Sequence, residues 1–202
     1  MYKCNWSKKS SVEEEYHDKE WGVPILDDVK LFEIFLLETA QAGLSWQTML
    51  VKRDNYRRAY KNYDVNKIAK YNERDVERLL ADEGIVRNKL KINASINNAK
   101  LYLEVQKEYG SFCHYLWSFV DYKQINTKVN KEDKIPVSTK LSDIISNDMK
   151  KKGFKFIGTT TIYAYIQSVG LVNDHVKKCH RYETVKKLGQ KVHKRLGSSL
   201  NK

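Results

Sequence analysis

From Leu31 to Trp46 the chain reads LFEIFLLETAQAGLSW, a mainly apolar run that leads into a Gly-containing turn and a Trp. An α-helix turns by about 100° per residue, so Leu31, Phe35 and Glu38 lie within about 60° of one another. Gly43 then stops the helix, because glycine readily adopts the left-handed conformation that often follows a helix end. The stretch predicts an amphipathic helix with a carboxylate on its apolar face.

The two acids of this helix receive different interpretations. Glu33 points away from the apolar face and is expected to be an ordinary solvated charge. Glu38 lies on that face, where an unpaired ionised carboxylate is costly to bury. It is therefore either an ion-pair partner of one of the 37 Lys and Arg residues, with Trp46 in the core, or part of a pocket. A carboxylate beside a stacking aromatic suits a flat, polar or cationic ring.

The rest of the chain favours helices. Only two prolines and nine glycines interrupt 202 residues. Apolar residues recur at helical spacing in eight segments, at about 28–42, 47–61, 65–71, 74–82, 86–109, 111–119, 141–152 and 159–169. The exception is Ile125 to Val137, which is expected to be a loop with a short extended piece. The predicted fold class is mainly α.

Composition indicates a globular protein with an anionic partner. The chain has 41% hydrophobic and 31% charged residues and a formal net charge of +12. Such a balance favours nucleic acid as the partner, with an acidic membrane surface as the second choice. It contains no apolar run of about 18 residues and no signal-peptide core near its N-terminus, so we expect no membrane association and a cytoplasmic location.

The positive charge is concentrated at the C-terminal end. Residues 181–202 hold seven Lys and Arg and a single acid, Glu183. We expect this segment to be a solvated basic tail, frayed or weakly helical, that follows one folded domain over residues 1–180.

Cysteines and histidines suggest a metal site. Cys4 and His17 lie near the N-terminus, whereas His175 and Cys179 lie four residues apart near the other end. Two thiolates and two imidazoles would complete a tetrahedral structural zinc site that joins both ends of the chain. The alternative is that these are scattered core residues, and His180 is a rival ligand.

A second turn suggests a backbone-binding hairpin. The sequence GFKFIG, from Gly153 to Gly158, separates two helical segments, the second of which opens at Thr159. Glycines allow a phosphate to approach the backbone, and the N–H groups at a helix start point toward it. Lys155 adds positive charge. The turn thus resembles a helix-hairpin-helix element that grips DNA without reading bases, although any corner between two helices can use such a turn.

Over about residues 1–180 the chain resembles the DNA-3-methyladenine glycosylase I family of the helix-hairpin-helix superfamily. The resemblance rests on six blocks in the same order: Cys4-Asn5-Trp6, Tyr16-His17-Asp18-Lys19-Glu20-Trp21-Gly22-Val23-Pro24, Leu37-Glu38 through Gln41-Ala42-Gly43-Leu44-Ser45-Trp46, Leu116-Trp117-Ser118-Phe119-Val120, Gly153 through Thr160, and Gly170-Leu171-Val172-Asn173-Asp174-His175.

The resemblance implies a two-lobed helical glycosylase. Its expected substrate is double-stranded DNA that contains alkylated adenine, and its expected product is free 3-methyladenine. It implies that a monomeric enzyme flips out the damaged base and hydrolyses its N-glycosidic bond. It places Glu38, as the catalytic group, with Tyr16 and Trp46 in the base pocket. Trp6 is a further expected wall of that pocket or, alternatively, a core aromatic. The resemblance also assigns zinc to Cys4, His17, His175 and Cys179. From the hairpin residues themselves we expect Gly153, Lys155, Gly158 and Thr159 to hold the DNA backbone.

One departure concerns the edge of the pocket. Glu13 stands where the family commonly has an aromatic residue. Two groups are not expected to act in the chemistry. Asp174 abuts a predicted zinc ligand and should face elsewhere, and Lys155 should face phosphate, which indicates a monofunctional enzyme without lyase activity. Two other classes stay open, namely a non-catalytic DNA-binding module and a zinc-dependent hydrolase.

Overall fold

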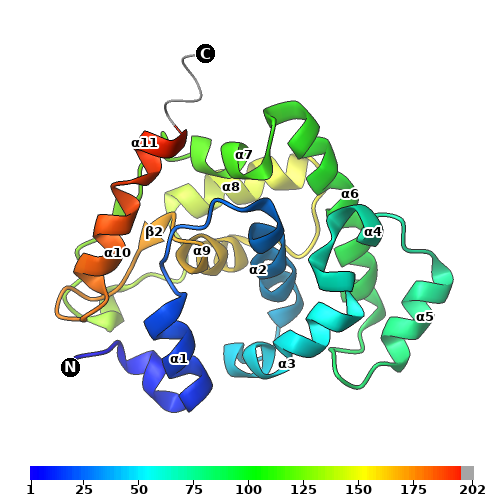
Figure 1. Ribbon diagram of the computed structural model, residues 1–202, viewed down its shortest axis with the longest axis horizontal. Coiled ribbons are helices and arrows are strands. Elements are labelled where there is room, and N and C mark those ends of the chain that lie inside the picture. The colour runs from blue at the N-terminus through cyan, green and yellow to red at the C-terminus, as the bar shows by residue number, and fades with distance from the viewer. Residues whose placement is uncertain (197–202) are drawn as a thin grey trace.

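The structure is a computed structural model that describes residues 1–196. Helices dominate it (Figure 1), which confirms the predicted fold class. The α-helices are α1 (Ser11–Lys19), α2 (Asp28–Gln41), α3 (Trp46–Ala59), α4 (Val65–Ile68), α5 (Glu73–Ala81), α6 (Lys89–Tyr109), α7 (Phe112–Ser118), α8 (Lys140–Lys151), α9 (Thr159–Ser168), α10 (Tyr182–Gly189) and α11 (Val192–Leu196). Three short 3₁₀ helices are η1 (Asn5–Lys9), η2 (Lys61–Tyr63) and η3 (Glu132–Lys134).

Helix α2 lies at the centre of the molecule. The Asp27 side chain caps its first turn by accepting a hydrogen bond from the Lys30 N–H. Its end is the predicted one, because Gly43 has φ +79° in the turn that leads to α3. Helices α3, α6, α7 and α9 all contact α2, and every residue from 31 to 40 is buried. A helix enclosed in this way positions the side chains of a site from the inside of the molecule.

The enclosure of α2 corrects the expectation for Glu33. This residue is only 4% exposed and accepts hydrogen bonds from Arg53 Nε at 2.6 Å and Lys30 Nζ at 3.1 Å. Burial alone would raise the pKa of Glu33, but Arg53 and Lys30 hold it below its usual value. The helical wheel placed Glu33 opposite the apolar face correctly. The prediction that this side of α2 faces solvent was wrong, because α3 covers it.

Where the structure describes the basic tail, it is helical, which is one of the two expected forms, but the expectation that it is solvated is wrong. Residues 182–196 form α10 and α11, whose apolar side chains Tyr182, Val185, Val192 and Leu196 are buried. These side chains are spaced three or four residues apart within each helix and therefore share a face, which outweighs the charge of their neighbours. The remainder of the predicted tail, residues 197–202, lies outside the described residues.

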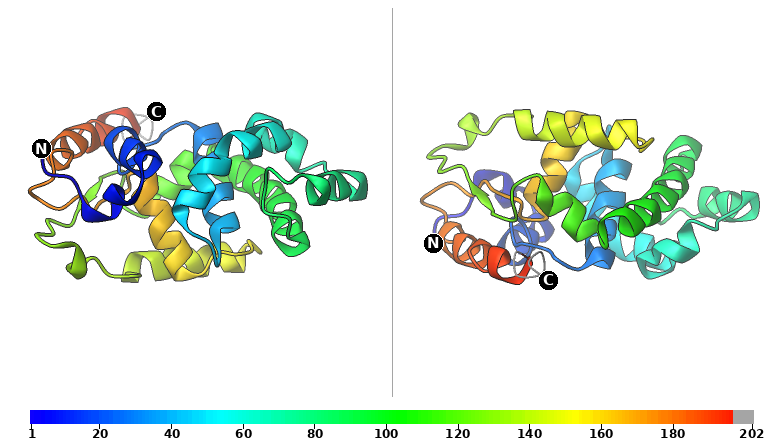
Figure 2. Two further views of the ribbon diagram at one scale, coloured as in Figure 1. Left: turned by 90° about the horizontal axis from the view of Figure 1, so that it is seen from below. Right: turned by 90° about the horizontal axis from the view of Figure 1, so that it is seen from above.

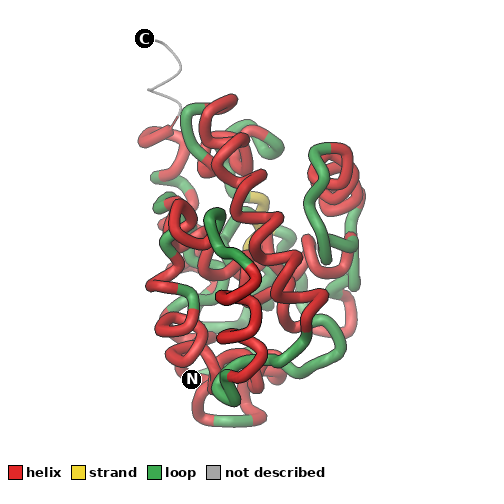
Figure 3. Tube along the Cα trace, turned by 90° about the vertical axis from the view of Figure 1, so that its right-hand side faces the viewer, coloured by secondary structure: helices red, strands yellow, loops and turns green. Residues whose placement is uncertain are grey.

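The N-terminal segment and residues near position 180 lie at the same end of the molecule, where the His180 N–H donates to the Tyr2 carbonyl oxygen. Helices α1 and α10 lie at this end, with α11 beyond α10, and α4 and α5 lie at the opposite end (Figures 1 and 2). The predicted extended piece is β1 (Ile125–Asn126), which pairs in parallel with β2 (Val172–Asn173), with Ile125 opposite Val172. This small ladder is surrounded by helices (Figure 3) and leads directly into His175. Among residues 1–196, no helix is both long and apolar enough to span a bilayer.

Candidate functional site

A cavity of about 380 Å³ lies between α1, α2, α3 and α9. All four residues predicted for the base pocket line it: Trp6, Tyr16, Glu38 and Trp46. Seven further lining residues were not predicted, namely Trp21, Gln41, Glu132, Ile135, Ala164, Gln167 and Ser168. Those from position 132 onward come from segments far from α2 in the sequence, so no local pattern could assign them to this cavity.

Glu38 reaches the cavity from α2 with 3% of its surface exposed. The Ser168 hydroxyl of α9 donates a hydrogen bond of 2.7 Å to Glu38 Oε1. Within residues 1–196 no Lys or Arg forms an ion pair with this carboxyl group, which rules out the ion-pair alternative. Burial raises the pKa of Glu38 to about 8, and the Ser168 hydrogen bond only partly offsets that rise. The cavity therefore holds a carboxyl group whose protonated form is favoured by burial.

Aromatic rings form the other walls of the cavity. The ring of Tyr16, on α1, lies 5.4 Å from that of Trp46, at the start of α3, with 57° between their planes. The Trp6 ring lies 5.0 Å from the Trp21 ring and 6.5 Å from the Tyr16 ring. Trp6 is therefore a cavity wall in the structure. Together these rings provide flat surfaces on which another planar group can stack.

Two polar atoms of these rings are buried without a hydrogen-bond partner in the described part of the chain. They are the Tyr16 hydroxyl and the Trp46 Nε1–H. Burial, and then the nearby Glu38, raise the pKa of Tyr16, so its hydroxyl stays protonated. Buried polar groups are rarely left unsatisfied in native proteins. Here both belong to residues that line the cavity, so a ligand with polar edges can satisfy them.

Glu13, which departs from the family pattern, does not line the cavity. The Ser10 side chain accepts a hydrogen bond from the Glu13 N–H and donates one of 2.9 Å to Glu13 Oε2. This is a capping arrangement at the start of α1. Glu13 thus stabilises the helix that carries Tyr16 and His17.

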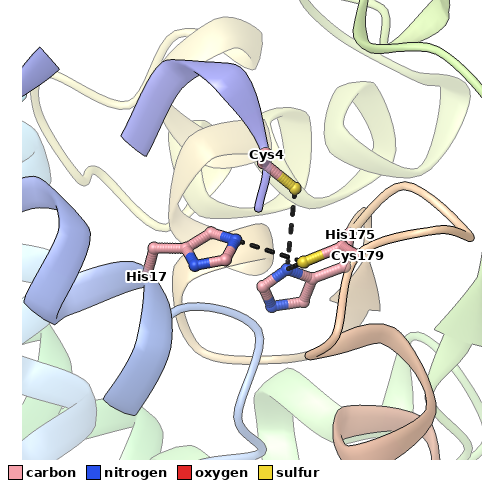
Figure 4. A group of neighbouring side chains, drawn as sticks. All are labelled: Cys4, His17, His175 and Cys179. Atoms are coloured by element: carbon pink, nitrogen blue, oxygen red, sulfur yellow. Dashed lines mark hydrogen bonds between the residues drawn. The ribbon is translucent and has the colours of Figure 1, made fainter. Parts of the chain in front are cut away.

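The four predicted metal ligands form one buried cluster (Figure 4). The ligand atoms of Cys4, His17, His175 and Cys179 all lie within 4.8 Å of one another. The Cys179 sulfur is 3.4 Å from His17 Nε2 and 3.6 Å from His175 Nδ1, and the Cys4 sulfur is 3.8 Å from His175 Nδ1. The alternative of scattered core residues is therefore wrong, and the cluster could hold a metal ion.

The outer nitrogens of both histidines support this assignment. His175 Nε2 lies 3.0 Å from the Trp21 carbonyl oxygen, and His17 Nδ1 lies 2.8 Å from Asp18 Oδ1. Each outer nitrogen must donate to its oxygen, so a neutral ring turns a lone pair toward the two sulfurs. Such outer hydrogen bonds are typical of histidines that bind metals. His180 is not in the cluster, because its ring nitrogens face the Tyr2 carbonyl oxygen at 3.1 Å and Asp18 at 3.4 Å.

The predicted hairpin joins α8 to α9. Phe154 and Ile157 are buried and anchor the turn, whereas Lys155 and Gly158 are exposed. Gly153 has φ +97°, a conformation that favours glycine. A Cβ at Gly158 would meet nothing within 4 Å, so packing within the protein does not require glycine at this position.

The start of α9 at the hairpin offers free backbone donors. Gly158 is its N-cap, and no side chain caps the first turn. Thr159 lies in this turn, and its hydroxyl is 2.8 Å from that of Ser142 on α8. Lys152 faces the protein, because it pairs with Glu108 at 2.9 Å. The hairpin thus presents open backbone at the N-terminus of a ten-residue helix, a place where an anion is stabilised.

Asp174 is buried and engaged within the protein. It accepts hydrogen bonds from Thr127 at 2.5 Å, Tyr163 at 2.6 Å and Gln167 at 2.6 Å. It does not line the cavity, in agreement with the expectation that it faces elsewhere.

Comparisons with known proteins agree with the residue-level picture. A family model described as methyladenine glycosylase matches residues 6–182. DNA-3-methyladenine glycosylase 1 of Escherichia coli (strain K12) is 47% identical over 182 residues, which cover 90% of this chain and 97% of that protein. DNA-3-methyladenine glycosylase of Haemophilus influenzae is 44% identical over 177 residues, 88% of this chain and 96% of that protein.

A solved structure gives the same result for the fold. It is that of 3-methyladenine DNA glycosylase I from Staphylococcus aureus, which concerns 3-methyladenine recognition by that enzyme. It is 33% identical and superposes with a TM-score of 0.86, covering 89% of this chain and 96% of that one. The resemblance predicted from six sequence blocks is thereby confirmed, and this chain belongs to the methyladenine glycosylase family.

Proposed function

We propose that the protein is a monofunctional DNA glycosylase that excises 3-methyladenine from double-stranded DNA and leaves an abasic site. The observation that carries the proposal is Glu38, a buried carboxyl group without a cationic partner among residues 1–196, inside an aromatic cavity. Membership of the methyladenine glycosylase family supports the same substrate class.

The cavity suits an alkylated adenine that has been flipped out of the helix. Alkylation at N3 places positive charge on the ring of the nucleoside. Trp46 and Tyr16 offer aromatic faces, and a desolvated cation–π contact contributes on the order of 1–2 kcal/mol. The Tyr16 hydroxyl and Trp46 Nε1–H can donate to acceptors on the base, and Glu38 can accept from its amino edge. Trp6 closes the cavity on the side of the N-terminal segment.

The chemical step needs little acid catalysis. The positive charge already weakens the glycosidic bond, so the protein must extract the base and stabilise a sugar with oxocarbenium character. In this proposal the cationic nucleoside lowers the pKa of Glu38, whose proton passes to solvent water, and the resulting carboxylate then favours the charged ring. None of the described residues that line the cavity is a lysine. Attack by water, rather than by a protein amine, therefore follows, and we propose no lyase step.

The hairpin is proposed to hold the DNA backbone. Gly153 and Gly158 allow close approach, the N–H groups from Thr159 onward can donate to a phosphate, and Lys155 adds a charge. The net charge of +12 supports double-stranded DNA as the partner. We further propose that residues 1–180 form the glycosylase domain and act as a cytoplasmic monomer; sedimentation of the protein with and without a DNA duplex tests the oligomeric state.

The metal cluster is proposed to bind structural zinc. A tetrahedral zinc with bonds of about 2.3 Å to sulfur and about 2.0–2.1 Å to nitrogen separates these two kinds of ligand by about 3.5 Å. The sulfur–nitrogen distances here, 3.4 to 3.8 Å, agree with that value. Four protein ligands leave no open position for a substrate, so the zinc ion would join the two ends of the chain and take no part in catalysis.

The decisive experiment uses DNA methylated with a simple alkylating agent. Wild-type protein should release free 3-methyladenine, detected by chromatography, and leave sites that alkali cleaves only afterwards. Glu38→Gln should release it much more slowly, whereas Glu104→Gln, an exposed carboxylate on α6, serves as the matched control. A wild-type protein that binds DNA but releases no base would indicate the non-catalytic DNA-binding module. Release that stops on chelation while the fold stays intact would indicate the zinc-dependent hydrolase.

A further inference from the structure

Helix α6 contacts two parts of the protein that the proposed function places near the DNA. They are the turn beside the base cavity and the hairpin from Gly153 to Gly158. Helix α6 lies beside α2 (Figure 1). Near its start, Lys91 Nζ donates hydrogen bonds of 2.8 Å to the Ala40 carbonyl oxygen and 2.6 Å to the Ala42 carbonyl oxygen. These two carbonyls belong to the end of α2 and to the turn that leads into α3. Lys91 therefore holds the turn between the helix of Glu38 and the helix of Trp46.

Two turns further along, α6 holds the hairpin. The Asn98 side chain is buried, donates to the Lys155 carbonyl oxygen at 3.0 Å and accepts from the Lys155 N–H at 2.8 Å. Asn97 donates to the Gly153 carbonyl oxygen at 3.1 Å. The conformation of the hairpin backbone is thus fixed by α6 as well as by α8 and α9.

The two contacts lie on the same side of α6. Lys91 and Asn98 are seven residues apart, which places them on one helix face about 10 Å apart along the axis. An α-helix is stiff over two turns, so α6 connects the turn at Ala42 to the hairpin at Lys155 over a fixed distance.

We propose that α6 is the spacer that sets the distance between the phosphate-binding hairpin and the base cavity, and that Lys91 is its positioning residue at the cavity end. The proposal rests on the function proposed above. A base can enter the cavity only if the hairpin grips the backbone at the right distance, because misplacement of reacting groups by about 1 Å can slow catalysis roughly 100-fold. Losing the Lys91 contacts would free the turn at Ala42 while the hairpin keeps its own anchors.

An alternative role for Lys91 is a direct contact with a DNA phosphate. The two roles differ in a measurable way. Each phosphate contact that is lost lowers the slope of log affinity against log salt by about 0.9 for double-stranded DNA. A positioning residue that uses its donors on backbone carbonyls leaves that slope unchanged.

The test compares Lys91→Met with wild type, with Lys91→Arg and with Lys100→Met. Met keeps the apolar stem of Lys91 but removes both hydrogen bonds, and Arg restores donors. Lys100 is exposed on the opposite face of α6, so Lys100→Met removes the same charge from the same helix without touching the turn. Four quantities are measured for each protein: melting temperature, affinity for free 3-methyladenine, affinity and salt slope for undamaged duplex, and single-turnover excision from methylated duplex.

The expected result is that Lys91→Met excises the base roughly 10- to 100-fold more slowly. Its free-base affinity, duplex affinity and salt slope should stay within about two-fold of those of Lys100→Met, and Lys91→Arg should recover most of the excision rate.

Three results overturn the proposal: unchanged excision, a salt slope lower by about one than that of Lys100→Met, or a free-base affinity that falls in parallel with excision. The second would make Lys91 a phosphate contact, and the third would make it part of the cavity wall. If wild type itself excises no base, the proposed function fails and the spacer role fails with it. An active wild type with an unaffected Lys91→Met overturns the spacer role alone.

Discussion

The protonation of Glu38 links the stability of the protein to its activity. Burial raises the pKa of this carboxyl group from 4.5 to about 8. Between these values the folded protein holds a proton that the unfolded chain has lost, so the free energy of unfolding falls as pH rises through this window. Binding of a cationic base requires the ionised form. Activity and stability should therefore respond to pH in opposite directions.

We accordingly predict that kcat/KM for excision rises with pH up to about 8 and then levels off. Glu38→Gln should be poorly active at every pH, and its unfolding free energy should lack the decline between pH 5 and 8. At pH 8 it should equal or exceed the wild type in stability. Denaturant titrations and excision rates across the pH range test both parts. A variant that is less stable than wild type at pH 8 while retaining its affinity for the base would refute the cavity role of Glu38.

At the residue scale, the helical pattern singled out Glu38 as an unusual carboxylate on an apolar face, but it wrongly predicted that Glu33 is exposed to solvent. A helical wheel shows which residues share a face, and it shows nothing about what covers the other faces. The metal ligands were easier to find, because the chain has only three cysteines and five histidines. Ser168, Gln167 and Glu132 carry no such signal, since serine, glutamine and glutamate are common residues. Their places in the cavity follow from the packing of distant segments against α2.

At the scale of elements, a partly buried ion-pair cluster links the helices α1, α2 and α3, which line the cavity. Arg53 of α3 donates two hydrogen bonds of 2.8 Å to Glu20, which follows α1, and one of 2.6 Å to Glu33 of α2. Burial alone would raise the pKa values of Glu20 and Glu33, but Arg53 holds both below normal. The stability that this pairing contributes is present above the unfolded pKa of the carboxyl groups and is lost as pH falls.

We predict that Arg53→Met lowers the free energy of unfolding by about 3 kcal/mol at pH 7, because it leaves two carboxylates without their main partner. The difference from wild type should shrink toward pH 4, where the carboxylates of the variant can take up protons. Arg57→Met, which removes a half-exposed and longer contact of 3.4 Å to Glu33, is the matched control and should cost less than about 1 kcal/mol. Equal losses in the two variants would contradict the dominant role of Arg53.

The hairpin gives a second prediction at this scale. Gly158 has φ −55°, which any residue can adopt, and open space where a Cβ would lie. Gly158→Gln should therefore fold with an unchanged melting temperature. Its side chain should still block the approach of a phosphate, so affinities for undamaged and abasic duplexes should fall alike, by roughly ten-fold or more. Affinity for free 3-methyladenine should not change. If duplex binding is also unaffected, the hairpin is only a corner between α8 and α9.

Across the whole molecule, the order of the helices was predictable and the position of the C-terminal segment was not. Long apolar repeats with few breaks specify α2, α6 and α9 directly. Helices α10 and α11 are short and basic, and their few apolar residues gain stability only from contact with distant parts of the chain. For example, Val185 Cγ1 lies 3.5 Å from where a Cβ of Gly22 would lie. Charge composition alone therefore led to the wrong expectation for residues 182–196.

The metal cluster allows a prediction for the molecule as a whole. Cys179→Ser should lower the melting temperature strongly and reduce the bound zinc measured by elemental analysis, since structural zinc sites contribute directly to folding free energy. Below its melting temperature, the variant should still excise 3-methyladenine, because Cys179 does not line the cavity. Cys113→Ser is the control, as Cys113 is buried away from the cluster and should leave zinc content unchanged. Full zinc content in Cys179→Ser would contradict the proposed ligand set.

The same cluster has a consequence for the protein during its synthesis. Cys4 and His17 are synthesised well before their partners His175 and Cys179, which lie far along the chain. The N-terminal segment also supplies Trp6 and Tyr16 to the cavity. Until residues 175–179 have emerged, the first two ligands have no partners, and this wall of the cavity lacks the anchor that the metal cluster provides. We therefore expect a chain that stops before residue 175 to hold this wall of the cavity less firmly and to bind a damaged base more weakly than the chain that contains all four ligands.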